Sequence, residues 1–205
     1  MAVSALVLAA FALIGTALVA ITNSLTESRI AANEKAQQLR AFAELIDPAR
    51  YNNQLDTDTL TVQDPELLGT SDNVLVYRAR TNGEPVALLF GVVAPDGYSG
   101  NIDLLVGINR DGTLSGVRVT RHRETPGLGD VIEVERSDWI LAFDGKSLKA
   151  PPEVSWRVKK DGGEFDQITG ATITPRAVVG AVYRALQFYR DNRERLFATE
   201  LTLNE

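Results

Sequence analysis

The sequence predicts an α+β protein in which an N-terminal transmembrane helix precedes an antiparallel sheet with helices packed on it. Three observations predict this class. Residues 1–21 contain 18 apolar residues and no charged one, residues 74–121 alternate β-rich runs with turn sequences, and residues 175–197 carry apolar side chains at helical spacing. Runs of strands followed by a helix, without regular alternation of the two, are typical of α+β proteins.

The first predicted element is a membrane anchor over residues 1–24. Each of the 21 basic and 27 acidic residues follows Ser24. At a rise of about 1.5 Å per residue, the apolar segment spans roughly 30 Å as a helix, the thickness of a bilayer's hydrocarbon core. A cleaved signal peptide, with Gly15-Thr16-Ala17 as its cleavage site, is the alternative. The apolar core of a signal peptide is usually only about 7–15 residues long, which favours a retained single-pass anchor.

A helical connector follows over residues 25–48, and the main domain over residues 49–205. The connector is rich in Ala, Gln, Glu and Lys, and we expect its apolar stripe to pack against the domain: Leu39, Phe42, Leu45 and Ile46. No Lys or Arg precedes the anchor to indicate its orientation. A long polar domain behind an N-terminal anchor is most simply placed outside the cytoplasm.

Two hairpins are predicted to form the sheet, after a polar loop over residues 51–73 that includes at most one short strand. Asn-Gly between two β-rich runs is the strongest short-range hairpin signal. The predicted strands and turns are, in order, Val74–Arg80, Asn82-Gly83, Pro85–Ala94, the loop Pro95–Gly100, Ile102–Ile108, Asp111-Gly112, Leu114–Arg121 and the glycine-rich loop Thr125–Gly129.

The last third of the domain is predicted to be mostly helical. Ser137–Phe143 is expected to be a short helix with Trp139 buried, and Val154–Lys159 a strand with Trp156 in the core. A long helix is expected from Pro175 to Phe197, with the Thr174 hydroxyl as its N-cap and proline at the first helical position. Its buried face is predicted to consist of Val178, Val179, Val182, Leu186 and Tyr189.

Composition excludes several function classes. The chain contains no cysteine, one histidine (His122) and no methionine other than Met1. Iron–sulfur clusters, thiolate zinc sites, a zinc site of three histidines and haem with two axial ligands are therefore excluded. A net charge of −6 and a pI near 4.9 argue against binding to nucleic acid. Redox chemistry on this chain would have to use an organic cofactor.

The segment Asp161–Arg176 is the strongest candidate for chemistry. The small residues Thr169, Gly170 and Ala171 precede Thr172 in the turn that leads into the long helix. Free N–H groups and the positive end of the helix dipole suit a phosphate there, and the lack of side-chain bulk lets a large group approach. An ordinary glycine turn, with Thr172 as a capping hydroxyl, explains the same residues. The segment matches neither the Walker loop nor the dinucleotide-binding fingerprint.

The run Asp-Gly-x-x-x-Asp-x-x-Thr-Gly-Ala-Thr-x-Thr, over Asp161–Thr174, resembles the flavinylation motif of FMN-binding domains. The wider match resembles the G-subunit family of the Rnf (Rsx) electron-transport complex and, more distantly, the C-subunit family of the sodium-pumping NADH:quinone reductase. Three further segments carry it in the family's order: Ala94–Gly100, Glu124–Asp130 and Lys159–Gly163. With the N-terminal helix, the resemblance extends over essentially the whole chain.

The resemblance implies that a flavin transferase links FMN through its phosphate to the hydroxyl of Thr172. It implies a single-pass electron carrier of a bacterial inner membrane, with its domain on the periplasmic side. This carrier would work with the other Rnf subunits in an ion-translocating oxidoreductase between NADH and ferredoxin. The implied cofactor-binding residues are Thr169, Gly170, Ala171, Glu124, Thr125, Leu128, Lys160 and Tyr98. No residue is expected to be catalytic or to bind a metal, and the redox capacity rests on a single flavin.

Several of these residues also have a structural interpretation. Asp161 and Asp166 are expected to be recognised by the transferase, or else to form turns. Lys160 could offer a cation to the phosphate or ring, or be a solvated surface residue, and Tyr98 could stack on the flavin or simply pack. His122, beside two arginines, is interpreted as structural rather than as a proton donor, because like charges disfavour its protonated form.

Two other functions are compatible with the same residues. One is a structural or assembly protein of the complex whose flavin site has no function. The other is an anchored extracytoplasmic solute-binding module in which two glycine-rich loops, Pro95–Gly100 and Thr125–Gly129, form the pocket.

Overall fold

The computed structural model describes the backbone of residues 2–198 and their side chains, except those of residues 2–5, 10, 21–25 and 27–38. Contacts divide the chain into two compact units, residues 1–42 and residues 43–205. Helix α1 (Ala2–Leu45) forms the first unit, and its last residues belong to the second. It covers the predicted anchor, except Met1, which lies outside the described residues, and nearly all of the predicted connector. Within the described part of the chain, no helix combines the length and apolar content needed to cross a membrane.

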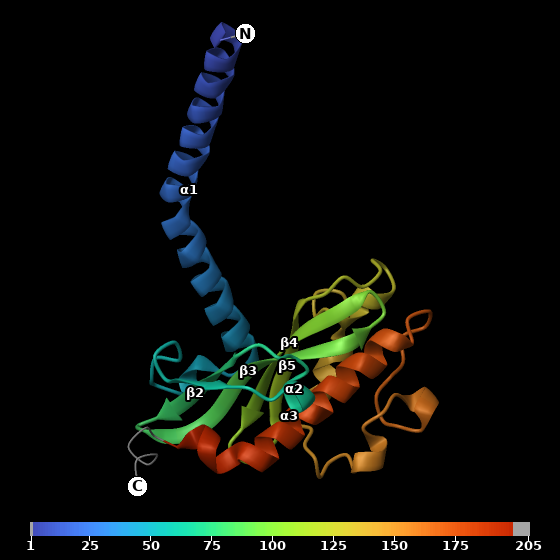
Figure 1. Ribbon diagram of the computed structural model, residues 1–205. Helices are drawn as coiled ribbons and strands as arrows, with labels where there is room; N and C mark the ends of the chain where they lie inside the picture. Colours follow the sequence, from blue (N-terminus) through green and yellow to red (C-terminus); the bar gives the residue numbers. More distant parts are fainter. Residues whose placement is uncertain (1, 199–205) are drawn as a thin grey trace. The chain divides into compact units, whose positions relative to one another are not determined.

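The second unit confirms the predicted α+β class. Its five strands form one sheet in which each strand pairs antiparallel with the next along the chain, and α3 (Ile173–Phe197) runs along this sheet (Figure 1). The strands are β1 (Thr59–Val62), β2 (Val74–Thr81), β3 (Glu84–Gly97), β4 (Gly100–Asn109) and β5 (Leu114–Arg121). The remaining elements are α2 (Pro65–Leu68) and the short 3₁₀ helices Pro48–Arg50, Gly129–Ile132, Asp138–Phe143, Glu153–Ser155 and Lys159–Asp161.

Local turn chemistry explains both predicted hairpins. Asn82 and Gly83 have φ angles of 52° and 86°, and the paired residues Thr81 and Glu84 flank them. Two successive positive φ angles are typical of the type I′ turn, whose twist matches that of the strands it joins. In the second turn, the Asp111 carboxylate accepts a hydrogen bond from the backbone N–H of Thr113 (2.9 Å). A hydrogen bond from the Thr113 hydroxyl and this backbone hydrogen bond lower the pKa of Asp111.

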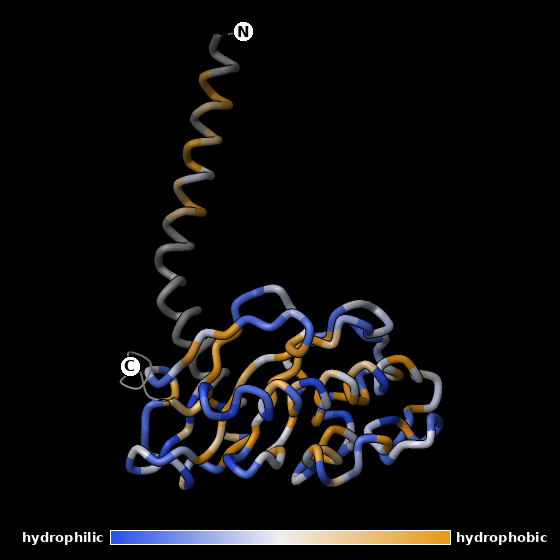
Figure 2. The backbone as a smooth tube through the Cα atoms, turned by 60° about the horizontal axis from the view of Figure 1, so that its bottom comes forward, coloured by the Kyte–Doolittle hydropathy of each residue, from blue (hydrophilic) through white to orange (hydrophobic). Residues whose placement is uncertain are grey.

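The core lies between the sheet and α3. Figure 2 shows the apolar segments inside the second unit and the polar ones in its outer loops. Phe188 of α3 contacts Phe90 of β3, with ring centroids 5.7 Å apart. All five residues predicted for the buried face of the long helix are buried: Val178, Val179, Val182, Leu186 and Tyr189. Of the predicted connector stripe, Leu45 and Ile46 are buried in the second unit, whereas Leu39 is exposed.

The predicted loop Pro95–Gly100 is wrong over most of its length. Strand β3 continues to Gly97 and β4 begins at Gly100, so that only Tyr98 and Ser99 form the turn. The register shifts between Ala94 and Gly97, and such a bulge accommodates a proline because no ladder hydrogen bond is needed there. A Cβ on Gly97 would lie 2.3 Å from the carbonyl oxygen of Gly100, so position 97 requires glycine.

The predicted strand Val154–Lys159 is also wrong. The segment consists of 3₁₀ turns, and its one bridge joins Val158 to Phe165. Trp156 is buried, as expected, and Val158 is buried too. This alternation resembles that of a strand, although no neighbouring strand pairs with it. Trp139, which was predicted to be buried, is only partly covered. Its indole N–H donates to the Asp166 carbonyl oxygen (2.7 Å), and its ring contacts Phe143.

Two arginines of β2 hold the C-terminal end of α3. Arg78 donates to the carbonyl oxygen of Ala198 (2.7 Å), and Arg80 to that of Phe197 (2.9 Å). Both guanidinium groups also donate to the carboxylate of Asp58, at 2.5 and 2.8 Å. Cations are favourable at the C-terminal end of a helix dipole, and buried arginines require an anionic partner. Asp58 thus neutralises the group that fixes this end of α3.

We expect Asp58→Asn to lower the free energy of unfolding by about 2 kcal/mol, because it leaves two nearly buried guanidinium groups without a counter-charge. Urea denaturation of the full chain, followed by tryptophan fluorescence, measures this. The matched control is Asp103→Asn, which removes the partner of the highly exposed Arg121 and should cost less than about 1 kcal/mol. Equal losses in the two variants would contradict the interpretation.

Candidate functional site

Three segments distant in the sequence form a cavity of about 410 Å³. They are the turn between β3 and β4, the loop that follows β5, and the turn that leads into α3. The residues that line the cavity are Tyr98, Glu124, Thr125, Leu128, Gly129, Gly170, Ala171, Thr172, Ile173 and Thr174. Tyr98, Leu128 and Ile173 are exposed apolar side chains, so the cavity presents apolar surface to its surroundings.

The buried carboxylate of Glu124 connects the three segments. Its side chain belongs to the loop after β5, and the residue is only 4 % exposed. Its Oε1 accepts a hydrogen bond from the backbone N–H of Ser99 (2.9 Å), in the β3–β4 turn. Its Oε2 accepts a hydrogen bond from the hydroxyl of Thr174, in the first turn of α3. Because a buried carboxylate needs such donors, Glu124 requires all three segments to be in place together.

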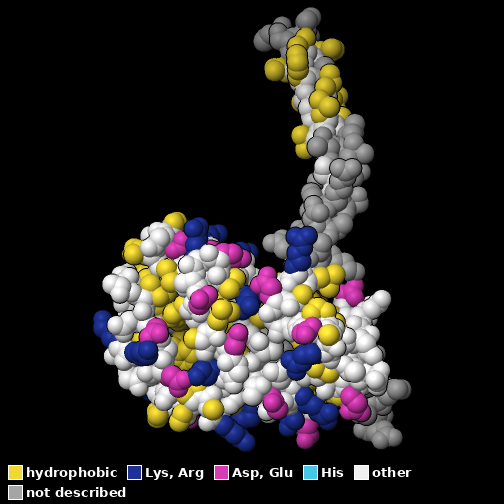
Figure 3. Space-filling view, turned by 180° about the vertical axis from the view of Figure 1, so that it is seen from behind, with side chains coloured by type: hydrophobic (Ala, Val, Ile, Leu, Met, Phe, Trp, Pro, Cys, Tyr) yellow, Lys and Arg dark blue, Asp and Glu magenta, His cyan; other side chains and the backbone are white. Residues whose placement is uncertain are grey.

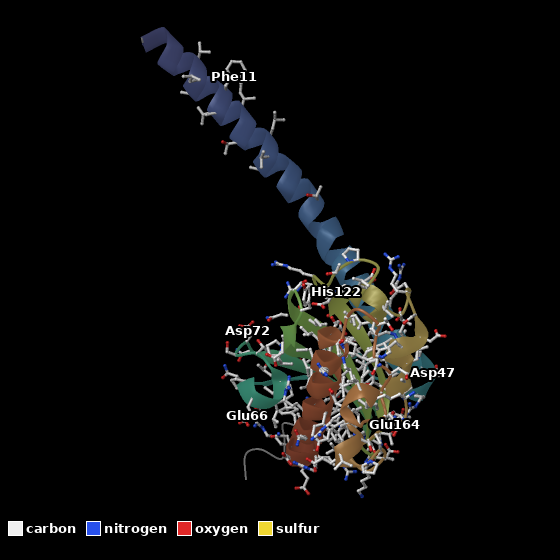
Figure 4. The ribbon with its side chains drawn as sticks, turned by 90° about the vertical axis from the view of Figure 1, so that its right-hand side faces the viewer. Phe11, Asp47, Glu66, Asp72, His122 and Glu164 are labelled. Carbon is white, nitrogen blue, oxygen red and sulfur yellow. The ribbon has the colours of Figure 1, made fainter. Side chains whose placement is uncertain are left out.

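The loop after β5 is shaped by hydrogen bonds on both sides of Glu124. His122 lies where β5 passes into this loop (Figure 4). Its Nδ1 accepts from the backbone N–H of Glu124 (3.0 Å), so that Nε2 carries the proton and donates to Glu133 (2.7 Å). Further along, the N–H groups of Leu128 and Gly129 both donate to the Thr125 carbonyl oxygen. These contacts support the structural interpretation of His122.

Helix α3 begins two residues earlier than predicted. Its N-cap is Thr172 rather than Thr174, and Pro175 is the third helical residue. Thr174 does not cap the helix, because its hydroxyl is engaged by Glu124. The Thr172 hydroxyl makes no capping hydrogen bond, and Thr172 lies on the cavity wall. Pro175 is tolerated as the third helical residue, since the first N–H groups of a helix have no partner within it.

The structure brings together seven of the predicted cofactor-binding and attachment residues and leaves two apart. Those on the cavity wall are Tyr98, Glu124, Thr125, Leu128, Gly170, Ala171 and Thr172. Thr169 and Lys160 are exposed and do not line the cavity. Gly170 has a φ of 85°, and a Cβ there would lie 3.2 Å from Leu128 Cδ2. Glycine thus allows the turn its conformation and its close approach to the opposite loop.

The two aspartates expected to be read by the transferase both form ion pairs within the chain. Asp161 binds Arg176 of α3 through two hydrogen bonds, at 2.6 and 2.7 Å. Asp166 binds Lys159 at 2.5 Å. Each aspartate therefore does more than form a turn, because its carboxylate also binds a basic side chain.

Each structural unit contains a segment that matches a known family. Residues 1–45 match the RnfG N-terminal region, and residues 97–187 match the FMN-binding domain. The G subunit of the ion-translocating oxidoreductase complex of Pseudomonas aeruginosa is 51 % identical over 198 residues, which cover 96 % of this chain and 92 % of the relative. The protein of the same description from Shewanella oneidensis is 45 % identical, with coverage of 96 % and 92 %.

The chain belongs to the family of ion-translocating oxidoreductase complex G subunits. This membership confirms the resemblance drawn from the motifs. A solved structure, Shewanella oneidensis NqrC, has the same fold, with a TM-score of 0.50, 20 % sequence identity and coverage of 75 % of each chain. All residues that line the cavity fall within the segment matched by the FMN-binding domain.

Three cavity residues of this G-subunit family member were not predicted as site residues: Gly129, Ile173 and Thr174. Gly129 closes the second glycine-rich loop. A Cβ there would lie 2.7 Å from Glu124 Cβ and 3.3 Å from the Thr174 hydroxyl oxygen. Thr174 is the last residue of the segment that resembles the flavinylation motif, and this place in the motif is the sequence signal that could have identified it. A role as helix cap also explains a threonine at this position. Its contact with Glu124 joins residues 50 positions apart in the sequence.

We expect Gly129→Ala to lower the free energy of unfolding by about 1–3 kcal/mol, because the added methyl group forces Glu124 away from Thr174. Thermal denaturation of the full chain measures the loss. Gly91→Ala is the matched control, since the nearest atom to its added Cβ is a carbonyl oxygen 3.9 Å away. If Gly129→Ala is as stable as Gly91→Ala, Glu124 does not hold the segments as described.

Proposed function

We propose that this protein is the electron-transfer subunit of an ion-translocating oxidoreductase and that it carries FMN covalently linked through its phosphate to Thr172. One observation carries the proposal: Thr172, whose hydroxyl makes no capping hydrogen bond, lies on the wall of a cavity at the start of α3, within the segment matched by the FMN-binding domain. When bound, FMN supplies one- and two-electron transfer, and in a chain without cysteine no side chain supplies the reversible two-electron step.

The residues at the start of α3 fit the phosphate of this cofactor. The first turn of the helix contains no acidic side chain. Its N–H groups, which have no partner within the helix, and the positive end of its dipole favour an anion. Gly170 and Ala171 leave the backbone accessible beside Thr172, as the attachment of a bulky group requires.

The rest of the cavity fits the flavin ring. A volume of about 410 Å³ lies within the roughly 300–1,000 Å³ typical of small-molecule sites. Leu128 offers an apolar surface and Thr125 a hydroxyl for the polar edge of the ring, while Tyr98 contributes an exposed aromatic face on another segment. Glu124 keeps these segments in register through Ser99 and Thr174.

Attachment requires a flavin transferase and an activated flavin. The Thr172 hydroxyl oxygen forms a phosphoester bond with the FMN phosphorus of a flavin dinucleotide such as FAD. The phosphoanhydride bond of the dinucleotide breaks, AMP leaves, and the hydroxyl proton passes to a base of the transferase. Nothing is oxidised or reduced in this step. Asp166, whose side chain is 69 % exposed, is available for recognition by the transferase.

The proposal includes a membrane anchor and a periplasmic domain. Residues 1–21 contain 18 apolar residues, and most of the described side chains of this segment lie exposed on α1 (Figure 3). Five large apolar side chains of this segment are each at least 70 % exposed: Leu6, Leu8, Phe11, Leu13 and Val19. Lipid is the environment that such a surface favours. Anchored in this way, the domain would relay electrons among the other subunits of the complex, between NADH and ferredoxin.

We expect Thr172→Val to abolish covalent flavin while leaving the thermal unfolding of the chain unchanged, because the side-chain shape is kept and the hydroxyl is lost. The full chain is produced together with a flavin transferase. Flavin fluorescence in a denaturing gel and mass spectrometry of the peptide spanning Asp161–Arg176 measure attachment. Thr172→Ser is the matched control and should retain the flavin. Covalent flavin in Thr172→Val, or an adduct on another residue, would overturn the assignment.

We expect the full chain to remain with membranes after an alkaline wash and its domain to be digested by protease added to spheroplasts. In the double variant Leu13→Asp and Leu18→Asp, each acidic residue costs about 2.5–3.5 kcal/mol at the centre of a membrane helix, so the protein should be released. The double variant Ser71→Asp and Thr120→Asp, at exposed positions of the second unit, is the control and should stay bound. Release of the unaltered chain would contradict the anchor.

A further inference from the structure

Asp161 and Arg176 close the segment that contains Thr172 into a loop. Asp161 ends the 3₁₀ helix Lys159–Asp161, and Arg176 is the fourth residue of α3. Arg176 Nε donates to Oδ2 of Asp161 (2.6 Å), and Nη2 donates to Oδ1 (2.7 Å). Two parallel hydrogen bonds between a guanidinium and a carboxylate fix orientation as well as distance. The pair therefore ties the start of α3 directly to residues 159–161.

The electrostatics of the helix start explain why this pair is needed. A cation near the N-terminal end of a helix is unfavourable, and the first turn of α3 contains no acidic residue to offset Arg176. Asp161 supplies the negative charge from outside the helix. Its hydrogen bonds with Arg176 lower the pKa of Asp161 and raise that of Arg176. The pair is thus fully formed above the ordinary pKa of an aspartate and is lost only as the pH falls through the lowered value.

The first part of the loop is anchored without Asp161. Phe165 is buried, and its ring stacks on Phe143 with centroids 4.6 Å apart. The backbone N–H of Lys159 donates to the Phe165 carbonyl oxygen (2.7 Å), and Trp139 donates to that of Asp166. The surrounding backbone is tightly packed, since a Cβ on the nearby Gly163 would overlap a backbone carbonyl group. Loss of the Asp161 carboxylate therefore leaves the fold in place.

The second part of the loop, residues 167–172, has fewer attachments. Ile168 is buried, and the Ala171 N–H donates to the Ile168 carbonyl oxygen (3.1 Å). Gln167, Thr169 and Gly170 are exposed. The position of Thr172 relative to the anchored part thus depends on Ile168 and the Asp161–Arg176 pair, in addition to the Glu124–Thr174 hydrogen bond at the start of α3.

The two aspartates of this segment differ in their availability to another protein. Both oxygens of Asp161 accept hydrogen bonds from Arg176, and its side chain is 33 % exposed. Asp166 binds Lys159 through one oxygen, and its side chain is 69 % exposed. Contact with a transferase therefore suits Asp166, whereas contact with Asp161 would require breaking a bidentate pair.

We propose that Asp161 and Arg176 form an intramolecular clamp that positions the Thr172 turn for flavin attachment. This inference rests on the proposed function, since it concerns the same hydroxyl. Asp161 is thus a positioning residue that acts through Arg176 and not, as the motif alone suggested, a residue read by the transferase.

Charge reversal tests the clamp. Purified full chains carrying Asp161→Arg, Arg176→Asp or both are incubated with a flavin transferase, FAD and Mg²⁺, and the initial rate of covalent labelling is measured. Each single reversal should lower the rate by about three- to fivefold, the equivalent of a lost exposed ion pair. The double reversal rebuilds the pair and should restore the rate to within about twofold of the unaltered chain. Tryptophan fluorescence verifies folding.

Asp191→Arg is the matched control, because it breaks another exposed bidentate pair, with Arg190, further along α3. It should label at the unaltered rate. If a reversed variant fails to fold, Asp161→Asn, Arg176→Gln and their combination replace the set. The two single variants should then show equally reduced rates of labelling, and the combined variant should be labelled no more slowly than either single variant.

Two results would overturn the clamp. In one, the double reversal stays as slow as Asp161→Arg while Arg176→Asp labels normally, which assigns Asp161 to the transferase. In the other, both single reversals label at the unaltered rate, so that the pair has no role. Failure of the unaltered chain to label would instead contradict the proposed attachment to Thr172, and the two failures are therefore distinguishable.

Discussion

The geometry of the candidate site depends on one buried carboxylate. Glu124 accepts hydrogen bonds from the backbone of the β3–β4 turn and from Thr174 in α3, while its own N–H donates to His122. A carboxylate in this environment is stable only when its donors are present, so the three segments must come together as a set. The absence of a side chain at Gly129 follows from the same constraint, because the Glu124 side chain occupies that space. The cavity is the space that these segments leave between them.

Helix α3 connects this site to the rest of the sheet, and charges act at both of its ends. At the C-terminal end, Arg78 and Arg80 bind the last carbonyl groups and are neutralised by Asp58. At the N-terminal end, Asp161 offsets Arg176, and the first turn contains no acid. Between the ends, the buried face of the helix packs on the sheet. The start of α3 is thus held firmly while its N–H groups stay available to an anion, as the proposed binding of a phosphate beside Thr172 requires.

Much of the fold could be predicted because it rests on local chemistry. The Asn82-Gly83 turn determines its hairpin through two positive φ angles, and the apolar spacing of residues 178–189 determines which face of α3 is buried. Predictions of secondary structure failed where a segment elsewhere in the chain determines whether a strand forms. Residues 95–97 look like a loop, yet a bulge against β4 keeps them in the sheet. Residues 154–159 have the alternation of a strand, but they have no neighbouring strand to pair with and form turns.

For the site, the sequence by itself determined the family resemblance, the candidate hydroxyl of Thr172 and most residues that line the cavity, because these lie in short motifs with characteristic spacing. It also limited redox chemistry to an organic cofactor, because the chain has no cysteine and one histidine. Only the tertiary structure decided the contacts of Thr174 and Asp161. The sequence pattern alone suggests a helix cap for Thr174 and a recognition residue for Asp161, whereas in the structure their side chains bind Glu124 and Arg176. Hydrogen-bond partners 50 and 15 positions away leave no local pattern, so folding alone assigns these contacts.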